Sequence, residues 1–250
     1  MSVSIKSEHE IELMRHAGHL LEQVHNELAS HIKPGISTKE LDRIGEDMIR
    51  SMGCIPNFKN YQGFPASFCI SLNDEVVHGI PSRQKIIQEG DLVKIDAGLI
   101  YKGYHSDAAR TYAVGEVSPE AERIVRVTKE CVELGLKAAK PWGHLGDIAY
   151  AINSHAQENG YSVVEEIGGH GIGLEFHEEP FVSYVTPKGS EMVLVPGMMF
   201  TIEPMINQGS PEFYVDEDNG WTVYTDDGMP SAQWEIQVLI TEDGYEILSW

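Results

Sequence analysis

The stretch "GDLVKIDAGLIYKGYHSDAARTYAVG", residues 90–115, contains two strand-like runs that meet at Tyr101–Gly103. Two such runs around a short turn predict a β-hairpin. We place the centre of the turn at Tyr101–Lys102, which sets Asp96 opposite Asp107. Directly opposite residues share one face of a sheet and lie about 5 Å apart, so two carboxylates there repel unless something positive lies between them. A metal ion is the simplest interpretation. The alternative is an aspartate that is hydrogen-bonded in a turn.

Helices and strands occur in blocks on both sides of this hairpin. Ser7 and Glu10 form a capping box that predicts a helix start, and Ser37 or Thr38 can cap a second helix. Residues 119–160 predict two more helices, split at "KPWGHLG". Other strands are predicted in a hairpin that turns at Asn73–Asp74, around Met199–Pro204, around Trp221–Thr225, and in the closing strand "AQWEIQVLIT", residues 232–241. This order predicts an α+β fold in which each half is built in the same way.

The composition is that of an acidic globular protein. The 250 residues contain no linker or low-complexity tract, so we expect one compact domain, residues 1–250. Eighteen Lys and Arg against 39 Asp and Glu give a formal charge of −21, which disfavours nucleic acid as a ligand. We also expect no membrane span and no secretory signal, and hence a cytoplasmic protein. The three cysteines form no C-x-x-C pair and are expected to be reduced thiols.

Two glutamates and a group of histidines also have unusual surroundings. Glu203 in "GMMFTIEPMI" and Glu235 in "SAQWEIQVLIT" lie in apolar strand-like runs, where a carboxylate needs a partner or must be neutral. In "IGGHGIGLEFHEEP", residues 167–180, glycines leave room for His170 to approach a metal, whereas His177 is placed to face a substrate. His78 in "EVVHGIP" offers a further imidazole. The alternatives are edge-strand glutamates that face water and histidines with a purely structural role.

The five acceptors Asp96, Asp107, His170, Glu203 and Glu235, in this order and spacing, resemble the metal ligands of the pita-bread metallopeptidases, family M24. Within that family the sequence is similar to the bacterial type I methionine aminopeptidases. The similarity extends over essentially the whole chain, and it rests on five stretches: "CISLNDEVVHGIPS", "KIDAGLIYKGYHSDAARTYAVG", "GGHGIGLEFHEEP", "GMMFTIEPMI" and "SAQWEIQVLIT". The resemblance implies a pita-bread fold, a pseudo-symmetric antiparallel β-sheet with helices packed on its outer face.

The resemblance also implies a role for each residue. Asp96 would bind one divalent ion, His170 and Glu203 the second, and Asp107 and Glu235 would bridge the two. The ions would be Co, Mn, Fe, Zn or Ni, and a hydroxide activated between them would attack the peptide bond. The catalytic residues would be His78 and His177, which stabilise the oxyanion, and Glu203, which shuttles a proton. The substrate-binding residues would be His78 and His177 at the scissile amide, and Tyr61, Phe64, Cys69, Phe176 and Trp221 around the methionine side chain.

The implied activity is removal of the N-terminal methionine from nascent proteins and peptides, with a preference for a small uncharged second residue. The implied partners are nascent polypeptides at the ribosome, and the expected state is a monomer. Two stretches depart from the usual family pattern. Ile236-Gln237 stand where His-Thr is usual, and "AGLIYKG" follows Asp96. Since Ile236 removes a polar neighbour of a bridging ligand, we expect a change in metal affinity or preference.

Two rival interpretations stay open from the sequence. A proline-directed aminopeptidase or dipeptidase shares the fold, but such enzymes commonly carry an extra N-terminal domain and additional active-site histidines. A binding module with the same shape and no metal is the second rival, although such proteins typically lose ligands.

Overall fold

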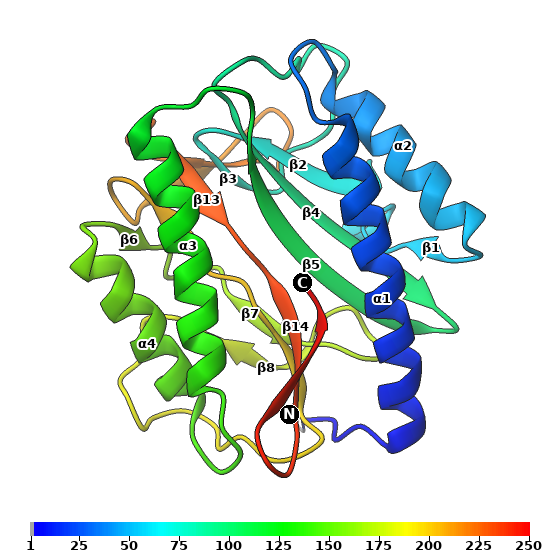
Figure 1. The fold of residues 1–250 in the computed structure, drawn as a ribbon, viewed down its shortest axis with the longest axis vertical. Coiled ribbons are helices and arrows are strands. Elements are labelled where there is room, and N and C mark those ends of the chain that lie inside the picture. Colours follow the sequence, from blue (N-terminus) through cyan, green and yellow to red (C-terminus); the bar gives the residue numbers. More distant parts are fainter. Residues whose placement is uncertain (1–2) are drawn as a thin grey trace.

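The computed structural model describes residues 3–250, and Figure 1 shows its helices and strands. The helices are α1 (Glu8–His31), α2 (Thr38–Ser51), α3 (Pro119–Ala138), α4 (Leu145–Glu158) and the short 3₁₀ helix η1 (Tyr61–Gly63). The strands of the first half are β1 (Ile55–Pro56), β2 (Phe68–Leu72), β3 (Glu75–Val77), β4 (Leu92–Tyr101) and β5 (Tyr104–Ala113). Those of the second half are β6 (Ser162–Val163), β7 (Gly169–Gly171), β8 (Glu178–Val182), β9 (Met199–Ile202), β10 (Met205–Asn207), β11 (Phe213–Val215), β12 (Val223–Thr225), β13 (Ser231–Gln233), β14 (Ile236–Ile240) and β15 (Tyr245–Ser249).

The molecule has two halves, each with a pair of helices beside its strands. In Figure 1, α1 lies over β4 and β5 with α2 beside it on the right, and α3 and α4 lie on the left. Each pair buries its own apolar cluster, one with Leu21, Leu28 and Ile95, the other with Val127 and Ile152. The α+β class and the pita-bread arrangement are therefore confirmed. In residues 3–250 the strands form four hydrogen-bonded antiparallel groups rather than one continuous sheet.

The β4–β5 hairpin forms as predicted, but its turn is displaced by one residue. Lys102 and Gly103 both have positive φ, 49° and 89°, as the two central residues of a type I′ turn require. The register therefore pairs Asp96 with Ala109 and Gly98 with Asp107. The prediction that Asp96 lies directly opposite Asp107 is wrong. The two carboxylates are diagonal neighbours on the same face, at a typical separation of about 7–8 Å between backbones.

A second strand pair is interrupted at the position of the two glutamates. Strands β9 and β14 pair with Ile202 opposite Ile236, and β10 and β13 continue the same register with Met205 opposite Gln233. Glu203 and Glu235 face each other in the gap between these two ladders. They lie beside the strands rather than inside them, so the predicted continuous strand over residues 232–241 is wrong. The interruption frees both side chains from the regular alternation of a paired strand.

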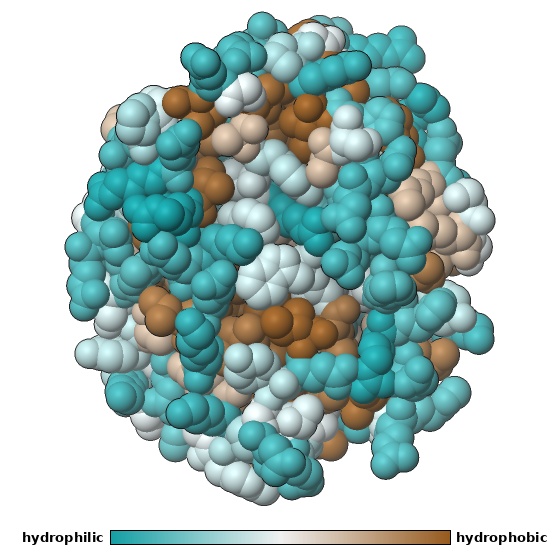
Figure 2. Space-filling view, viewed as in Figure 1, coloured by the Kyte–Doolittle hydropathy of each residue, from teal (hydrophilic) through white to brown (hydrophobic). Residues whose placement is uncertain are grey.

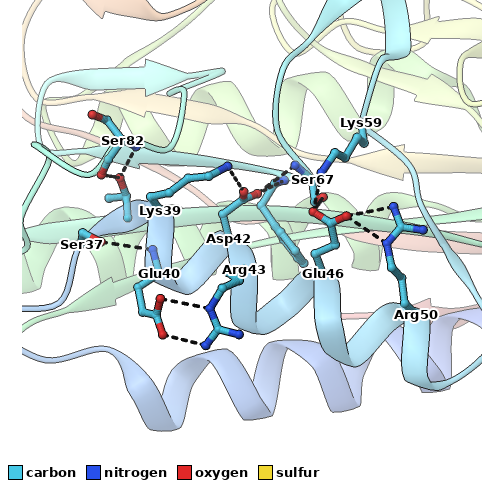
Figure 3. Close-up of polar contacts among 12 residues, drawn as sticks. Ser37, Lys39, Glu40, Asp42, Arg43, Glu46, Arg50, Lys59, Ser67 and Ser82 are labelled. Carbon is cyan, nitrogen blue, oxygen red and sulfur yellow. Dashed lines mark hydrogen bonds and ion pairs between the residues drawn. The ribbon is translucent and has the colours of Figure 1, made fainter.

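Two carboxylates of α2 fix the segment that joins β1 to β2 (Figure 3). The buried Asp42 accepts hydrogen bonds from the backbone N–H groups of Ser67 and Phe68, at 2.8 and 3.2 Å. Glu46 accepts from Lys59 Nζ at 2.6 Å and from Ser67 Oγ at 2.8 Å. Charge-assisted bonds of this kind are stronger than neutral ones. Residues 59–67 are thus held at both ends against a helix.

Several smaller expectations can also be compared with the structure. The capping box of Ser7 and Glu10 is present, and Ser37 rather than Thr38 caps the second helix. The turn at Asn73–Asp74 forms, although β2 and β3 belong to different sheets. The C-terminal strand β15 was not predicted. Figure 2 shows a largely hydrophilic face over the helices, with hydrophobic patches between them.

Three free cysteines are buried, Cys54, Cys69 and Cys131, which agrees with the expected thiols. Within residues 3–250, no helix combines the length and the apolar character that crossing a bilayer requires.

Candidate metal centre and substrate pocket

Five buried acceptors from both halves of the molecule converge behind the β4–β5 hairpin. Asp96 and Asp107 come from β4 and β5, His170 from β7, Glu203 from the end of β9, and Glu235 from the gap before β14. Their exposed fractions are 8, 3, 8, 7 and 1% respectively. Close packing around His170 needs its flanking glycines. A Cβ on Gly169 would lie 2.3 Å from Thr201 O, and one on Gly171 would lie 2.2 Å from Glu179 O.

The hydrogen bonds of His170 determine which ring nitrogen faces the carboxylates. Nδ1 lies 2.9 Å from the carbonyl oxygen of Gly171, which can only accept, so Nδ1 carries the proton. Burial lowers the pKa of His170 to about 3, so the ring is neutral and Nε2 has no proton. That bare nitrogen lies 3.7 Å from Asp107 Oδ2 and 3.6 Å from Glu203 Oε1. Three lone-pair acceptors therefore face one another.

The carboxylate oxygens around this nitrogen also have few partners. Both oxygens of Glu235 and Oδ1 of Asp96 and of Asp107 are buried without a hydrogen bond. Ligand atoms of Asp107, His170 and Glu235 all lie within 4.8 Å of one another. Buried acceptors without donors are costly, and a divalent cation satisfies several of them at once. This donor set of carboxylates and one imidazole fits a borderline divalent transition metal.

The pKa values of the acids have the same cause. Burial raises the pKa of Asp96 to about 7. Burial, followed by repulsion from neighbouring carboxylates, raises the pKa of Asp107 and of Glu235 well above the usual range. Burial does the same for Glu203, against a 2.6 Å hydrogen bond donated by Thr201 Oγ1. A cation between these groups would remove both the burial penalty and the repulsion.

Alternate residues of the chain that carries Glu235 are anchored to the β4–β5 hairpin. Ser231 O accepts from Lys94 Nζ at 2.8 Å, and Gln233 exchanges two hydrogen bonds with the Thr111 hydroxyl, at 2.6 and 3.0 Å. Glu235 N donates to Ala109 O at 2.8 Å. These contacts fix Glu235 relative to Asp107 although the residues come from different halves.

The two residues that depart from the family pattern have different environments. Ile236 is 1% exposed and packs in the apolar cluster beside α3 and α4, away from the acids. Gln237 Oε1 accepts from Ser106 Oγ at 3.0 Å and from the backbone N–H of Asp107 at 3.4 Å. The replacement therefore reaches the metal site through Gln237 and the backbone of Asp107, rather than directly at Glu235.

An apolar pocket of about 170 Å³ opens beside the acids. That volume holds one side chain and is below the roughly 300–1,000 Å³ of pockets for drug-sized ligands. All seven predicted substrate residues line it: Tyr61, Phe64, Cys69, His78, Phe176, His177 and Trp221. The rings meet edge to face, with centroids 5.0 Å apart for Tyr61 and Phe176 and 5.2 Å for Phe64 and Trp221. Burial raises the pKa of Cys69, so its thiol is neutral and weakly polar.

Two of the residues that line the pocket are histidines, His78 and His177. His177 Nδ1 lies 2.7 Å from the Tyr61 hydroxyl. If the hydroxyl donates, Nε2 of His177 carries the proton and can donate into the cavity. His78 has a left-handed backbone, φ 57°, which is uncommon outside glycine and is a form of strain found at functional sites.

Sequence reasoning missed two residues of the pocket wall, Phe58 and Gln62. Phe58 packs against Phe64 and Phe176, with centroid distances of 6.3 and 5.1 Å. The aromatic spacing at 58, 61 and 64 in "NFKNYQGF" was the available signal. Gln62 lies in η1 with positive φ, a local conformation that no sequence pattern indicated.

Comparisons with known proteins agree with this geometry. Residues 12–242 match metallopeptidase family M24. The chain is 46% identical to methionine aminopeptidase A of Synechocystis sp., covering 99% of this chain and 98% of the relative. It is 44% identical to methionine aminopeptidase 1 of Bacillus subtilis, covering 98% of each. The crystal structure of methionine aminopeptidase from Rickettsia prowazekii superposes with a TM-score of 0.98, at 39% identity and with full coverage of both chains.

Proposed function

The chain belongs to metallopeptidase family M24, among its bacterial type I methionine aminopeptidases, and from this premise we propose how its site works. It is a metal-dependent peptidase that removes N-terminal methionine. We propose that it uses two divalent ions and prefers substrates with a small uncharged second residue. The observation that carries this proposal is the bare Nε2 of His170, which faces the oxygens of Asp107 and Glu203 at 3.6–3.7 Å in a buried site.

In this proposal the five acceptors divide between two ions. Asp96 would hold one ion, His170 and Glu203 the other, and Asp107 and Glu235 would bridge them. When bound, two such ions supply Lewis acidity that activates a water and polarises the scissile carbonyl. Co, Mn, Fe, Zn and Ni all suit this donor set. Hydrogen bonds to β4 and β5 hold Glu235 in place. The protein itself therefore keeps the five residues in position.

The other side chains bind and orient the substrate. The aromatic wall and the Cys69 thiol take up the methionine side chain and exclude water from it. His78 and His177 donate hydrogen bonds to the oxygen of the scissile carbonyl, where negative charge develops, and each such donor is typically worth about 10²–10³ in rate. Glu203 accepts a proton at its carboxylate and returns it to the departing amine.

We further propose that residues 1–250 act as a single catalytic domain and a monomer, on nascent chains at the ribosome in the cytoplasm. The formal charge of −21 supports a role without direct binding to nucleic acid. The His78 and His177 rings line the same pocket as the acids, and this supports the preference for a small second residue, because a large side chain beside them would meet the two rings.

The test is hydrolysis of a panel of peptides: Met-Gly-Met, Ala-Gly-Met, Met-Pro-Gly, Met-Lys-Gly and acetyl-Met-Gly-Met. Each peptide is incubated with chelator and then with added Mn, Fe or Co. We expect metal-dependent release of Met from the unblocked peptides with a small second residue. Cleavage of Met-Lys-Gly at the rate of Met-Gly-Met would contradict the proposed preference, and no cleavage with any metal would favour a binding module.

A matched variant tests the site itself. Asp107→Ala should keep the fold, as read by circular dichroism, but lose turnover, because it removes a bridging carboxylate. Near-full activity in this variant would rule out the dinuclear arrangement. Asp243→Ala, an exposed acid in the turn before β15, is the control and should behave as wild type.

A further inference from the structure

Lys94 is a buried lysine on β4 that the proposed chemistry does not use. It is 1% exposed, although lysine is almost never fully buried without a partner. Its Nζ donates to two backbone carbonyls, Asn73 O and Ser231 O, each at 2.8 Å. Asn73 O also accepts from Ser231 N at 3.0 Å. The ammonium group therefore ties together three segments that are far apart in the sequence.

Each of these three segments leads within a few residues to the active site. Asp96 is two residues after Lys94 on the same face of β4. Glu235 is four residues after Ser231, and His78 is five residues after Asn73. Between Ser231 and Glu235 the chain is anchored again at Gln233, by the Thr111 hydroxyl. A displacement at Lys94 would therefore reach a metal ligand and a substrate-binding histidine together.

The Asn73 turn is firmly attached to β4, and it is linked to β13 by Lys94 together with the hydrogen bond from Ser231 N to Asn73 O. Asn73 Oδ1 accepts from Leu92 N, and Asn73 N donates to Leu92 O, at 2.9 and 3.0 Å. On the far side of the same hairpin, Ile70 N donates to Gly79 O at 2.8 Å, next to His78. The segment is thus a stiff unit, held at one end by Lys94 and by the Ser231 backbone and carrying His78 at the other.

We propose that Lys94 is a positioning residue for the peptidase reaction, an internal hydrogen-bond donor that sets His78 and Glu235 relative to Asp96. The proposal rests on the proposed function. Carbonyl oxygens are good acceptors for an ammonium group, and removing a buried charged partner leaves them unpaired. Burial lowers the pKa of Lys94 to about 7, and the nearby Glu75 and Asp74 oppose that change. Either protonation state can donate both hydrogen bonds, so the link holds on its geometry.

The first experiment compares Lys94→Met with wild type on Met-Gly-Met at saturating metal. Met keeps the length of the side chain and removes both donors. Because a displacement of about 1 Å can cost about 100-fold in rate, we expect kcat to fall by about 10–100-fold. KM should change less than kcat, because six of the seven pocket residues stay in place and the hydrogen bond of His78 acts mainly on the charge that develops in the transition state. Lys137→Met, at an exposed site at the end of α3, is the matched control and should match wild type. Wild-type kcat in Lys94→Met would overturn the proposal.

The second experiment uses chemical rescue. Lys94→Ala opens space beside the two carbonyls, where a free ammonium ion can donate the same hydrogen bonds. Ammonium chloride should restore kcat several-fold relative to tetramethylammonium chloride at equal ionic strength, about 0.1 M. Wild type and Lys94→Met, whose side chains fill the space, should not respond. If Lys94 only stabilised the fold, ammonium would raise the thermal midpoint of Lys94→Ala without restoring kcat, and that result would also overturn the proposal.

Thermal denaturation of the metal-free protein separates this proposal from the proposed function. Ammonium should raise the midpoint of Lys94→Ala, but not that of wild type, whether or not the enzyme turns over. If Lys94→Ala does not fold unaided, its refolding yield in the two salts gives the same comparison. Absence of Met release by wild type would refute the proposed function alone. Absence of any ammonium effect on rate, midpoint or yield would refute the role of Lys94 alone.

Discussion

Removing one of the buried acids should make the metal-free protein more stable, although it destroys the metal site. In metal-free protein, Asp96 is buried among carboxylates, and its pKa rises from 3.8 to about 7. Because the folded state holds this proton more tightly than the unfolded state, stability falls as pH rises from about 4 to 7. At about 1.4 kcal/mol per pH unit, this amounts to about 4 kcal/mol at pH 7.

Asp96→Asn keeps the shape of the side chain and removes the charge. We therefore expect urea denaturation with chelator at pH 7 to give a free energy of unfolding higher than that of wild type, by up to about 4 kcal/mol. In a chain of this size, each kcal/mol corresponds to about 2–4 °C in midpoint. The gain should shrink as the pH is lowered toward 4, since wild-type Asp96 becomes protonated. Asp243→Asn, at an exposed turn, is the control and should give no gain.

Adding metal should reduce the advantage of Asp96→Asn over wild type. Wild type gains stability on binding metal, by about 2.7 kcal/mol when the metal concentration is 100 times the dissociation constant. Asp96→Asn, which lacks one ligand, should gain less. The reasoning is refuted if metal-free Asp96→Asn is no more stable than wild type at pH 7. That result would mean that burying the Asp96 charge does not lower the free energy of unfolding.

Three other changes have outcomes that follow from single contacts. His25 is fully buried, and burial lowers its pKa from 6.5 to about 3. Its neutral form therefore contributes fully to the free energy of unfolding above about pH 6.5, and this contribution is lost as the pH falls toward 3. Between pH 7 and 5 the unfolding free energy of wild type should drop by about 2 kcal/mol relative to His25→Gln, measured with urea, and parallel curves would contradict this. Phe64→Ala should raise KM for Met-peptides without changing the metal affinity measured by calorimetry. An equal loss of activity on peptides with Met and with Ala at the N-terminus would show that the ring does not contact the methionine side chain. Tyr61→Phe should lower kcat by about tenfold by releasing the His177 ring, and a wild-type pH–rate profile and kcat would argue against that link.

The structure brings the predicted site residues together, whereas their local geometry was predicted less well. Asp96, Glu203 and Glu235 stand in apolar runs and His170 stands among glycines, and these patterns are visible in the sequence alone. The turn of the central hairpin was placed one residue early because Lys102 was not recognised as left-handed, although Gly103 indicates a type I′ turn. For that reason Asp96 and Asp107 were predicted to lie directly opposite each other, whereas they are diagonal neighbours.

Long-range contacts could not be predicted from the sequence. The interruption at Glu203 and Glu235 depends on two ladders that keep one register on either side of a gap. No local pattern reveals that, since Pro204 gives a reason only for one strand to stop pairing. Lys94 likewise looked like an ordinary polar residue in an apolar strand. Only the neighbouring Asn73 and Ser231 carbonyls explain why a lysine is buried there.

The proposed ligands come from both halves of the molecule, so a bound metal would act as a joint between them. Asp96 and Asp107 lie before the exposed segment 115–118, and the remaining three ligands lie after it. A chain cut between Val117 and Ser118 would give two fragments, each with its own helix pair and apolar cluster but with an incomplete set of ligands. Such fragments would reassemble more tightly when metal is present, and Met release would then report the availability of metal. The arrangement that positions a catalytic site would thus serve as a two-part metal sensor.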